Sequence, residues 1–132
     1  MSTKSSRPAP APEGSAATVL LCEGDGDLRQ ALAALLEGEG LKVVLAGNAR
    51  EAVSRAISSP PGCIVLSLPL PGADRGEALR GIRGLSGSAG TRVVAIAPPD
   101  LPLGEEEGFV RGRDERLPRT FGPRDLLAAI RR

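Results

Sequence analysis

The chemically reactive side chains of this 132-residue chain are few, because it contains no histidine and only two cysteines. The absence of histidine excludes His-ligated zinc and every catalytic nucleophile that depends on an imidazole base. With two Phe, no Trp and no Tyr, the chain lacks the aromatic platforms on which nucleic-acid bases stack. The net charge of +1 gives no general attraction for phosphate backbones. We therefore predict neither an enzyme nor direct nucleic-acid binding.

The polar groups that remain gather in four short segments, each of which follows an apolar run. Such runs are typical of strands buried on both faces of a parallel sheet. The carboxyl ends of parallel strands meet at one edge of the sheet, which is where ligands bind in open α/β folds. We therefore expect any site at four segments, namely 23–27, 67–71, 97–99 and 119–122.

The elements that must position these segments alternate along the chain. Apolar runs predict strands at 18–22, 41–46, 63–68, 92–97 and, more weakly, 114–118. Helical spacing predicts helices between and after them, with these inner faces: Leu28, Ala31, Leu32, Leu35 and Leu36; Ala52, Val53, Ala56 and Ile57; Ala78, Leu79, Ile82 and Leu85; Leu126, Leu127 and Ile130. A shorter helix is predicted at about 103–111, weakened by Gly104 and Gly108.

Local signals mark several boundaries. Asn48 is predicted to cap its helix, Gly38 and Gly40 to end the one before it, and 59–62 to form a turn. Strands that alternate with helices form βαβ units and a parallel sheet. The fold class is therefore α/β, a flavodoxin-like (βα)5 three-layer sandwich with strand order 2-1-3-4-5. One domain spans 18–132, and 1–17 is predicted to be a disordered tail rich in Ser, Pro and Ala.

The chain has only two cysteines, Cys22 and Cys63, and we predict that they do not form a disulfide. In the predicted sheet Cys22 ends one strand and Cys63 begins its neighbour. About five residues at ~3.3 Å each then separate them, beyond the ~7 Å limit for a disulfide. Both are predicted to be buried free thiols. No apolar segment is long enough for a signal peptide core or a membrane span, and we predict a cytoplasmic protein.

The segments VLLCEGDGDLR (19–29), IVLSLPLPG (64–72), RVVAIA (92–97) and RTFGPRDLLAAIRR (119–132) together resemble the receiver domain of two-component response regulators. The resemblance covers about 18–132. In that family an Asp at the end of the third strand takes a phosphoryl group from a kinase, and two acids after the first strand hold Mg²⁺ with it. A Thr or Ser ends the fourth strand, and a Lys-Pro pair follows the fifth.

The resemblance implies that these positions are degenerate in this chain. Ser67 stands at the phosphoacceptor position, Glu23 and Gly24 at the two acids, Ala97 at the hydroxyl, and Arg119 at the Lys. A Ser hydroxyl is not ionised at pH 7 and needs a base, and Ala97 cannot bond a phosphoryl oxygen. The resemblance therefore implies a pseudo-receiver with no bound metal and no cofactor.

Other roles for these residues stay open. Ser67 could be the substrate of a Ser/Thr kinase, although a strand end within a pocket is a poor place for it. Asp25 is either a replacement metal ligand or the cap of the helix that follows, the second being favoured. Arg119 either binds an anion or pairs with Glu23, again with the second favoured.

Charge is segregated in the last third of the chain. Between Asp100 and Glu107 there are four acids and no bases, whereas between Val110 and Arg132 seven Arg oppose three acids. In the resembling family the face formed by the fourth helix, fifth strand and fifth helix docks partners. We therefore expect protein binding through Glu105, Glu106, Arg111, Arg113, Arg116, Arg119 and Phe121, with a homodimer as one outcome. The alternative is local pairing of Glu105–Glu107 with Arg111 or Arg113.

Three functions are compatible with this pattern. The first is a phosphorylation-independent interaction module in bacterial signalling or regulation. The second is the N-terminal part of a longer DNA-binding or coiled-coil regulator. The third, ranked lower, is a flavodoxin-like small-molecule binder, which would lack both an aromatic stack and a glycine-rich phosphate loop.

Overall fold

A five-stranded parallel sheet forms the centre of the molecule, with strand order β3-β2-β4-β5-β6. The computed structural model describes residues 15–74, 77–85 and 87–132. The strands are β2 (Ser15–Cys22), β3 (Lys42–Ala46), β4 (Pro61–Ser67), β5 (Arg92–Ile96) and β6 (Glu115–Leu117). Numbered along the chain this is order 2-1-3-4-5, so the predicted flavodoxin-like fold is confirmed.

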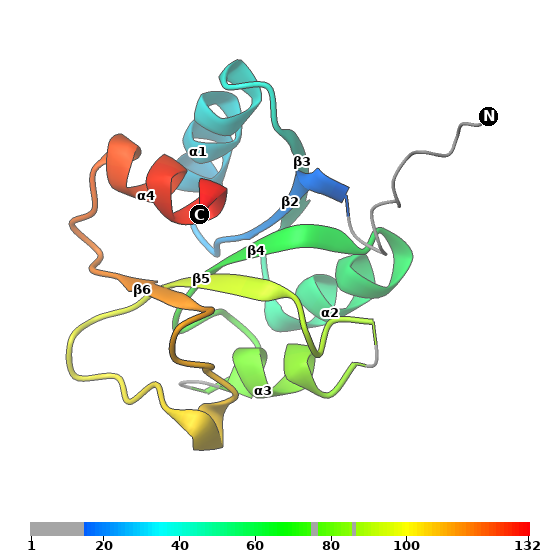
Figure 1. Cartoon of the computed structure of the whole chain (residues 1–132), viewed down its shortest axis with the longest axis vertical. Helices are drawn as coiled ribbons and strands as arrows, with labels where there is room; N and C mark the ends of the chain where they lie inside the picture. The colour runs from blue at the N-terminus through cyan, green and yellow to red at the C-terminus, as the bar shows by residue number, and fades with distance from the viewer. Residues whose placement is uncertain (1–14, 75–76, 86) are drawn as a thin grey trace.

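Helices cover both faces of the sheet (Figure 1). They are α1 (Gly26–Gly38), α2 (Ala49–Ser58), α3 (Glu77–Arg83) and α4 (Pro123–Arg131). One core layer packs α2 and α3 against Leu20, Ile64 and Val93, and the other packs α1 and α4 against Val19, Val65 and Val94. Successive side chains of each strand point alternately into the two core layers, which explains why these strands are apolar throughout.

Several expected boundaries and caps are confirmed. Asn48 caps α2, and its side chain accepts a hydrogen bond from the Glu51 N–H at 2.8 Å. Helix α1 ends at Gly38, and Gly40 has a φ of 88°, which glycine adopts without strain. Pro123 begins α4, as expected of a residue that lacks an N–H.

The two cysteines are buried and free. Cys22 pairs with Leu66 and Cys63 with Val19 in the sheet, and the two thiols lie in opposite core layers. The expected absence of a disulfide between them therefore agrees with the geometry. Burial raises the pKa of both thiols, that of Cys63 to about 11.

Some of the predicted helix faces are wrong. Leu28 and Ala31 are exposed, because the face that α1 buries is centred on Leu32, Ala33 and Leu36. Ile57 is 63% exposed, because α2 lies over the edge strand β3 and no further strand covers its outer side.

Strand ends also differ from expectation. β2 begins at Ser15 and not at Thr18, while the rest of the expected tail, 1–14, lies outside the described residues. β4 begins at Pro61, inside the predicted turn, because a proline is tolerated as the first residue of a strand.

The predicted helix at 103–111 is replaced by a single 3-10 turn, η1 (Glu105–Glu107). Gly104 and Gly108 lie inside the predicted range, and each disfavours a helix by about 1 kcal/mol relative to Ala. Gly108 then ends the turn in the left-handed region with a φ of 89°. The chain between β5 and β6 consequently runs as a wide loop (Figure 1).

Candidate functional site at the carboxyl end of the sheet

Three neighbouring strands bring Glu23, Ser67 and Ala97 to one edge of the sheet. Glu23 and Ala97 directly follow β2 and β5, and Ser67 is the last residue of β4. Cys22 is in register with Leu66, and Ser67 with Ile96, so the three positions lie next to one another. All three are buried. The sequence expectation that they share a location agrees with this placement.

The acidic loop after β2 is bound to its own backbone. The Glu23 carboxylate accepts the Asp25 N–H at 2.9 Å, and the Glu23 carbonyl accepts a hydrogen bond from Arg29 at 2.7 Å. Asp25 caps α1 by accepting the N–H groups of Asp27 and Leu28 at 2.9 and 3.1 Å. The predicted capping role of Asp25 is therefore confirmed.

Gly24 is closed in by a proline that follows β4. A Cβ built on Gly24 would lie 2.7 Å from both Cδ and Cγ of Pro71, closer than real Cβ atoms approach. Pro71 is itself held, since its carbonyl accepts the Ala49 N–H at 2.8 Å at the start of α2. A side chain at position 24 would therefore displace Pro71, which the sequence alone did not indicate.

Arg119 reaches across the sheet edge toward β4. Its guanidinium donates a hydrogen bond to the Leu68 carbonyl at 2.9 Å. Leu68 directly follows Ser67, so Arg119 places a positive charge beside this end of β4. No ion pair joins Arg119 to Glu23, both of which belong to the described chain. The expected Glu23–Arg119 pair is wrong, because a backbone carbonyl takes the place of the carboxylate.

Comparison with known proteins identifies the architecture. The chain is 24% identical to chemotaxis protein CheY4 of Vibrio cholerae, whose structure matches with a TM-score of 0.72 over 84% of this chain and 92% of that one. The receiver domain of sensor histidine kinase PA1611 from Pseudomonas aeruginosa, solved with magnesium in its active site cleft, matches with a TM-score of 0.72, 23% identity and coverage of 86% and 93%. The chain has the fold of a receiver domain.

Sequence similarity extends to curated response regulators. DNA-binding response regulator MtrA of Mycobacterium tuberculosis is 28% identical over 113 residues, which are 86% of this chain and 48% of that protein. Transcriptional regulatory protein ResD of Bacillus subtilis is 25% identical over 86% of this chain and 46% of its own length. The chain thus spans about half the length of the curated relatives it matches. No protein-family model matches it.

The residues at this end of the sheet do not fit a Mg²⁺ site. Mg²⁺ needs several hard oxygen ligands at ~2.0–2.1 Å. Gly24 supplies none, which leaves Glu23 and Asp25, and one oxygen of each carboxylate already accepts backbone N–H groups. Within the described residues, no three His, Cys, Asp or Glu side chains cluster in a way that could hold a metal ion.

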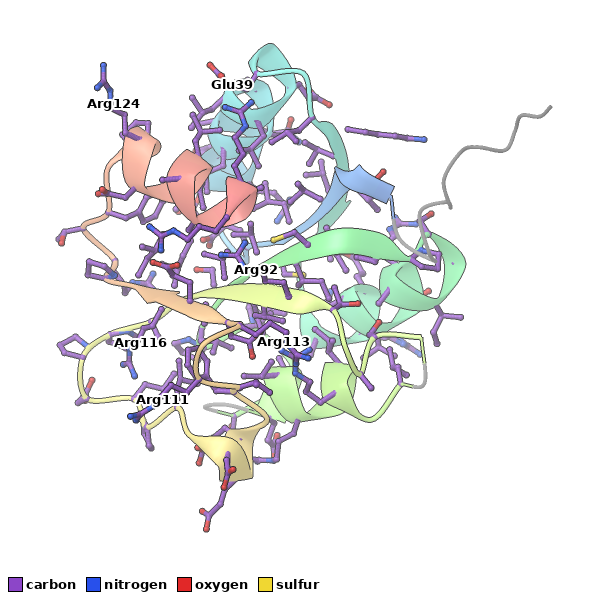
Figure 2. The ribbon with its side chains drawn as sticks, viewed as in Figure 1. Glu39, Arg92, Arg111, Arg113, Arg116 and Arg124 are labelled. Atoms are coloured by element: carbon purple, nitrogen blue, oxygen red, sulfur yellow. The ribbon has the colours of Figure 1, made fainter. Side chains whose placement is uncertain are left out.

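The residues expected to bind partners do not form one surface. Glu105 and Glu106 are exposed on η1, and Arg111 is exposed after it. Arg113 instead faces the amino ends of β5 and β6, where it lies 3.6 Å from Asp114 (Figure 2). Phe121 packs against the core layer of α1 and α4. The expected group therefore separates into an acidic turn, an arginine surface near β6 and two residues with structural contacts.

The expected local pairing of the acidic turn is also wrong. Glu107 accepts the Gly104 N–H at 2.6 Å. The ion pairs of the described residues join neither Glu105, Glu106 nor Glu107 to an arginine. The exposed carboxylates of Glu105 and Glu106 therefore have no arginine partner among the described residues.

A buried ion pair anchors the loop between β5 and β6. Arg83, at the end of α3, donates to the Asp114 carboxylate at 2.6 Å and to the Gly108 carbonyl at 2.8 Å. Asp114 also accepts the N–H groups of Val93 and Val110 at 3.0 and 2.7 Å. Sequence reasoning missed this pair, since nothing local links α3 to the residue before β6.

The Asp114 carboxyl is ionised in this setting. Burial on its own would raise its pKa. The hydrogen bonds from Arg83, Val110 and Val93, together with the charge of Arg83, outweigh burial and hold the pKa below its ordinary value. The pair fixes the loop, and with it the surface beside β6.

No helix within residues 15–74, 77–85 and 87–132 has the length and apolar composition that crossing a membrane requires.

Proposed function

We propose that this chain is a phosphorylation-independent pseudo-receiver that binds protein partners in bacterial signalling or regulation, in the cytoplasm. The observation that carries the proposal is the pair Ser67 and Gly24 at the end of the sheet. An ionised carboxylate attacks phosphorus directly, whereas the hydroxyl of Ser67 is not ionised at pH 7 and the chain has no histidine to act as its base.

Three further features of this end of the sheet support the loss of phosphoryl transfer. Pro71 occupies the space that a metal-binding side chain at position 24 would need. Ala97, buried beside Ser67, has no hydroxyl that could form a hydrogen bond with a phosphoryl oxygen. Arg119 is directed to the Leu68 carbonyl. Each of these departures removes a different part of the switch, so restoring one residue would not restore the chemistry.

A domain that has lost phosphoryl transfer still has a folded surface on which partners can bind. The segment after β5 and the residues of β6 carry exposed or half-buried arginines next to the exposed acids of η1. Opposed charges on one region favour selection of a charged partner. We assign partner binding to this region, with association of two copies as an alternative occupant, and no direct nucleic-acid binding.

Partner capture with and without acetyl phosphate and Mg²⁺ tests this function. The full chain is immobilised, and captured proteins from a bacterial lysate are quantified by mass spectrometry in both conditions. We expect the same partners in the same amounts, with losses for Arg116→Glu and none for Arg50→Glu on α2. Capture that requires acetyl phosphate would contradict the proposal, and losses confined to variants of α1 would show that the surface is misassigned.

A second candidate function follows from the length of the relatives. The curated relatives named above are about twice as long as the matched region, and one is named as a DNA-binding response regulator. The chain would then be the N-terminal receiver part of a longer regulator. The length of the gene, read from the genome of the source organism, distinguishes this from the first candidate.

A further inference from the structure

A hollow of about 530 Å³ opens beyond the carboxyl ends of β5 and β6. We call it the β5–β6 hollow. Ala97, Pro98 and Pro99 line it from the segment after β5, and Pro118 and Thr120 line it from the segment after β6. Arg116 and Arg119 complete its lining. Its walls are therefore mainly apolar, with two guanidinium groups as the charged features.

The segment between β5 and β6, all of which the structure describes, forms no α-helix. The loop there contains only the 3-10 turn η1, and the Arg83–Asp114 pair holds the far end of the loop against α3. In Figure 1 the loop passes wide of β6. In Figure 2 the labelled side chains of Arg111 and Arg116 extend into the region between β6 and this loop.

Both arginines of the hollow are held in place by backbone carbonyls. Arg116 donates to the Pro98 carbonyl, and Arg119 donates to the Leu68 carbonyl at 2.9 Å. A guanidinium has five N–H donors, so each keeps donors for a ligand. Neither arginine has a carboxylate partner among the described ion pairs, in contrast to Arg83, Arg92 and Arg132. The hollow therefore offers two fixed positive charges that the protein does not neutralise.

We infer that the β5–β6 hollow binds an extended acidic segment of a partner protein, an inference that rests on the proposed function and names its partner chemistry. Two carboxylates of the segment pair with Arg116 and Arg119. Arginine binds carboxylates through paired hydrogen bonds. A side chain that is already held in its binding conformation loses little conformational entropy when the ligand binds. An apolar residue between the carboxylates packs on Pro98, Pro99 and Pro118.

The surrounding charge limits the partner to a short acidic stretch. Asp100 and the exposed Glu105 and Glu106 lie on the loop that borders the hollow, and the segment 100–107 carries four acids and no bases. These carboxylates repel a long polyanion such as a nucleic acid. A pair of acids flanked by neutral or basic residues satisfies the two arginines and avoids this repulsion.

Fluorescence polarisation of the full chain with labelled peptides tests the inference. The probe is a set of Gly/Ser decapeptides, each with two Glu residues at varied spacing and a Leu or Phe between them. The control set has Gln in place of Glu. We expect binding of the Glu set alone, weakened about ten-fold by Arg116→Gln and by Arg119→Gln, and weakened further by salt. Arg124→Gln, on the exposed outer side of α4, should leave binding unchanged (Figure 2).

Three outcomes would overturn the inference. The first is no binding by any Glu peptide, the second is equal binding of the Gln set, and the third is an equal loss with Arg124→Gln. A variant with Arg116→Glu and Arg119→Glu that binds Lys-containing peptides instead would confirm the site independently. Partner capture that is unchanged by acetyl phosphate but survives these arginine variants would leave phosphorylation-independent partner binding intact, while this site and the surface assigned above both fail, so the two can be told apart.

Discussion

Replacing Asp114 with Asn removes the charge of the buried ion pair and almost nothing else. The Asp114 side chain is fully buried and accepts from Arg83 at 2.6 Å, Val110 at 2.7 Å and Val93 at 3.0 Å. An Asn amide has one accepting oxygen and one donating nitrogen, so one of these donors would face another donor. Arg83, 11% exposed, would keep its charge without a carboxylate.

The expected cost of Asp114→Asn is about 3 kcal/mol at pH 7, because removing one partner of a buried pair leaves the other charge uncompensated. The neighbouring Glu115→Gln is the matched control. Glu115 pairs with Arg132 at 2.5 Å and with Arg92 at 3.7 Å in a partly exposed setting, so its loss should cost less than about 1 kcal/mol.

The cost should also depend on pH with a defined sign. The pKa of Asp114 is lower in the folded protein than its ordinary value of about 3.9. The stabilisation is therefore present above that ordinary value and lost as pH falls through the folded pKa. Urea unfolding of wild type and variant at pH 7 and at acid pH measures both effects. A loss below 1 kcal/mol at pH 7, or a difference that stays constant into acid, would refute this account of the pair.

Three other predictions follow from separate features. Gly24→Ala should lower the free energy of unfolding by about 1–3 kcal/mol, because its Cβ would clash with Pro71. Gly38→Ala is the control, since a Cβ there meets open space. Equal effects of the two substitutions in urea unfolding would contradict the close contact of Gly24 with Pro71. Cys22 and Cys63 should resist iodoacetamide at pH 8 in the folded protein and react in urea, because burial raises the pKa of both thiols; labelling of the native protein detected by mass would argue otherwise. Asn48→Ala should lower the free energy of unfolding by about 1 kcal/mol, because α2 loses its N-cap. Ile57→Lys, on the exposed side of the same helix, should leave thermal unfolding nearly unchanged. A large loss of stability in Ile57→Lys would mean that Ile57 is buried.

The sequence was sufficient wherever a feature depends on neighbouring residues. Apolar runs such as 63–68 predict buried strands, and Asn48 and Pro123 mark helix starts, because capping and backbone constraints act within one turn. The edge where Glu23, Ser67 and Ala97 meet also follows from strand order alone.

Features that depend on the packing of distant segments could not be predicted. The contact of Pro71 with Gly24 joins two loops, and the Arg83–Asp114 pair joins α3 to the residue before β6. Leu28 and Ile57 fit the apolar period of their helices but are exposed, and periodicity does not report which part of a helix the sheet covers. The expected pair of Arg119 with Glu23 failed because an arginine can bind a backbone carbonyl equally well.

The proposal that this chain works without phosphorylation is tested by measuring the intact mass of the full chain after incubation with acetyl phosphate and Mg²⁺. A conventional response regulator treated in parallel serves as the positive control. We expect an unchanged mass for this chain under conditions that fully modify the control. A mass increase equal to one phosphoryl group, located to Ser67 and absent in Ser67→Ala, would contradict it.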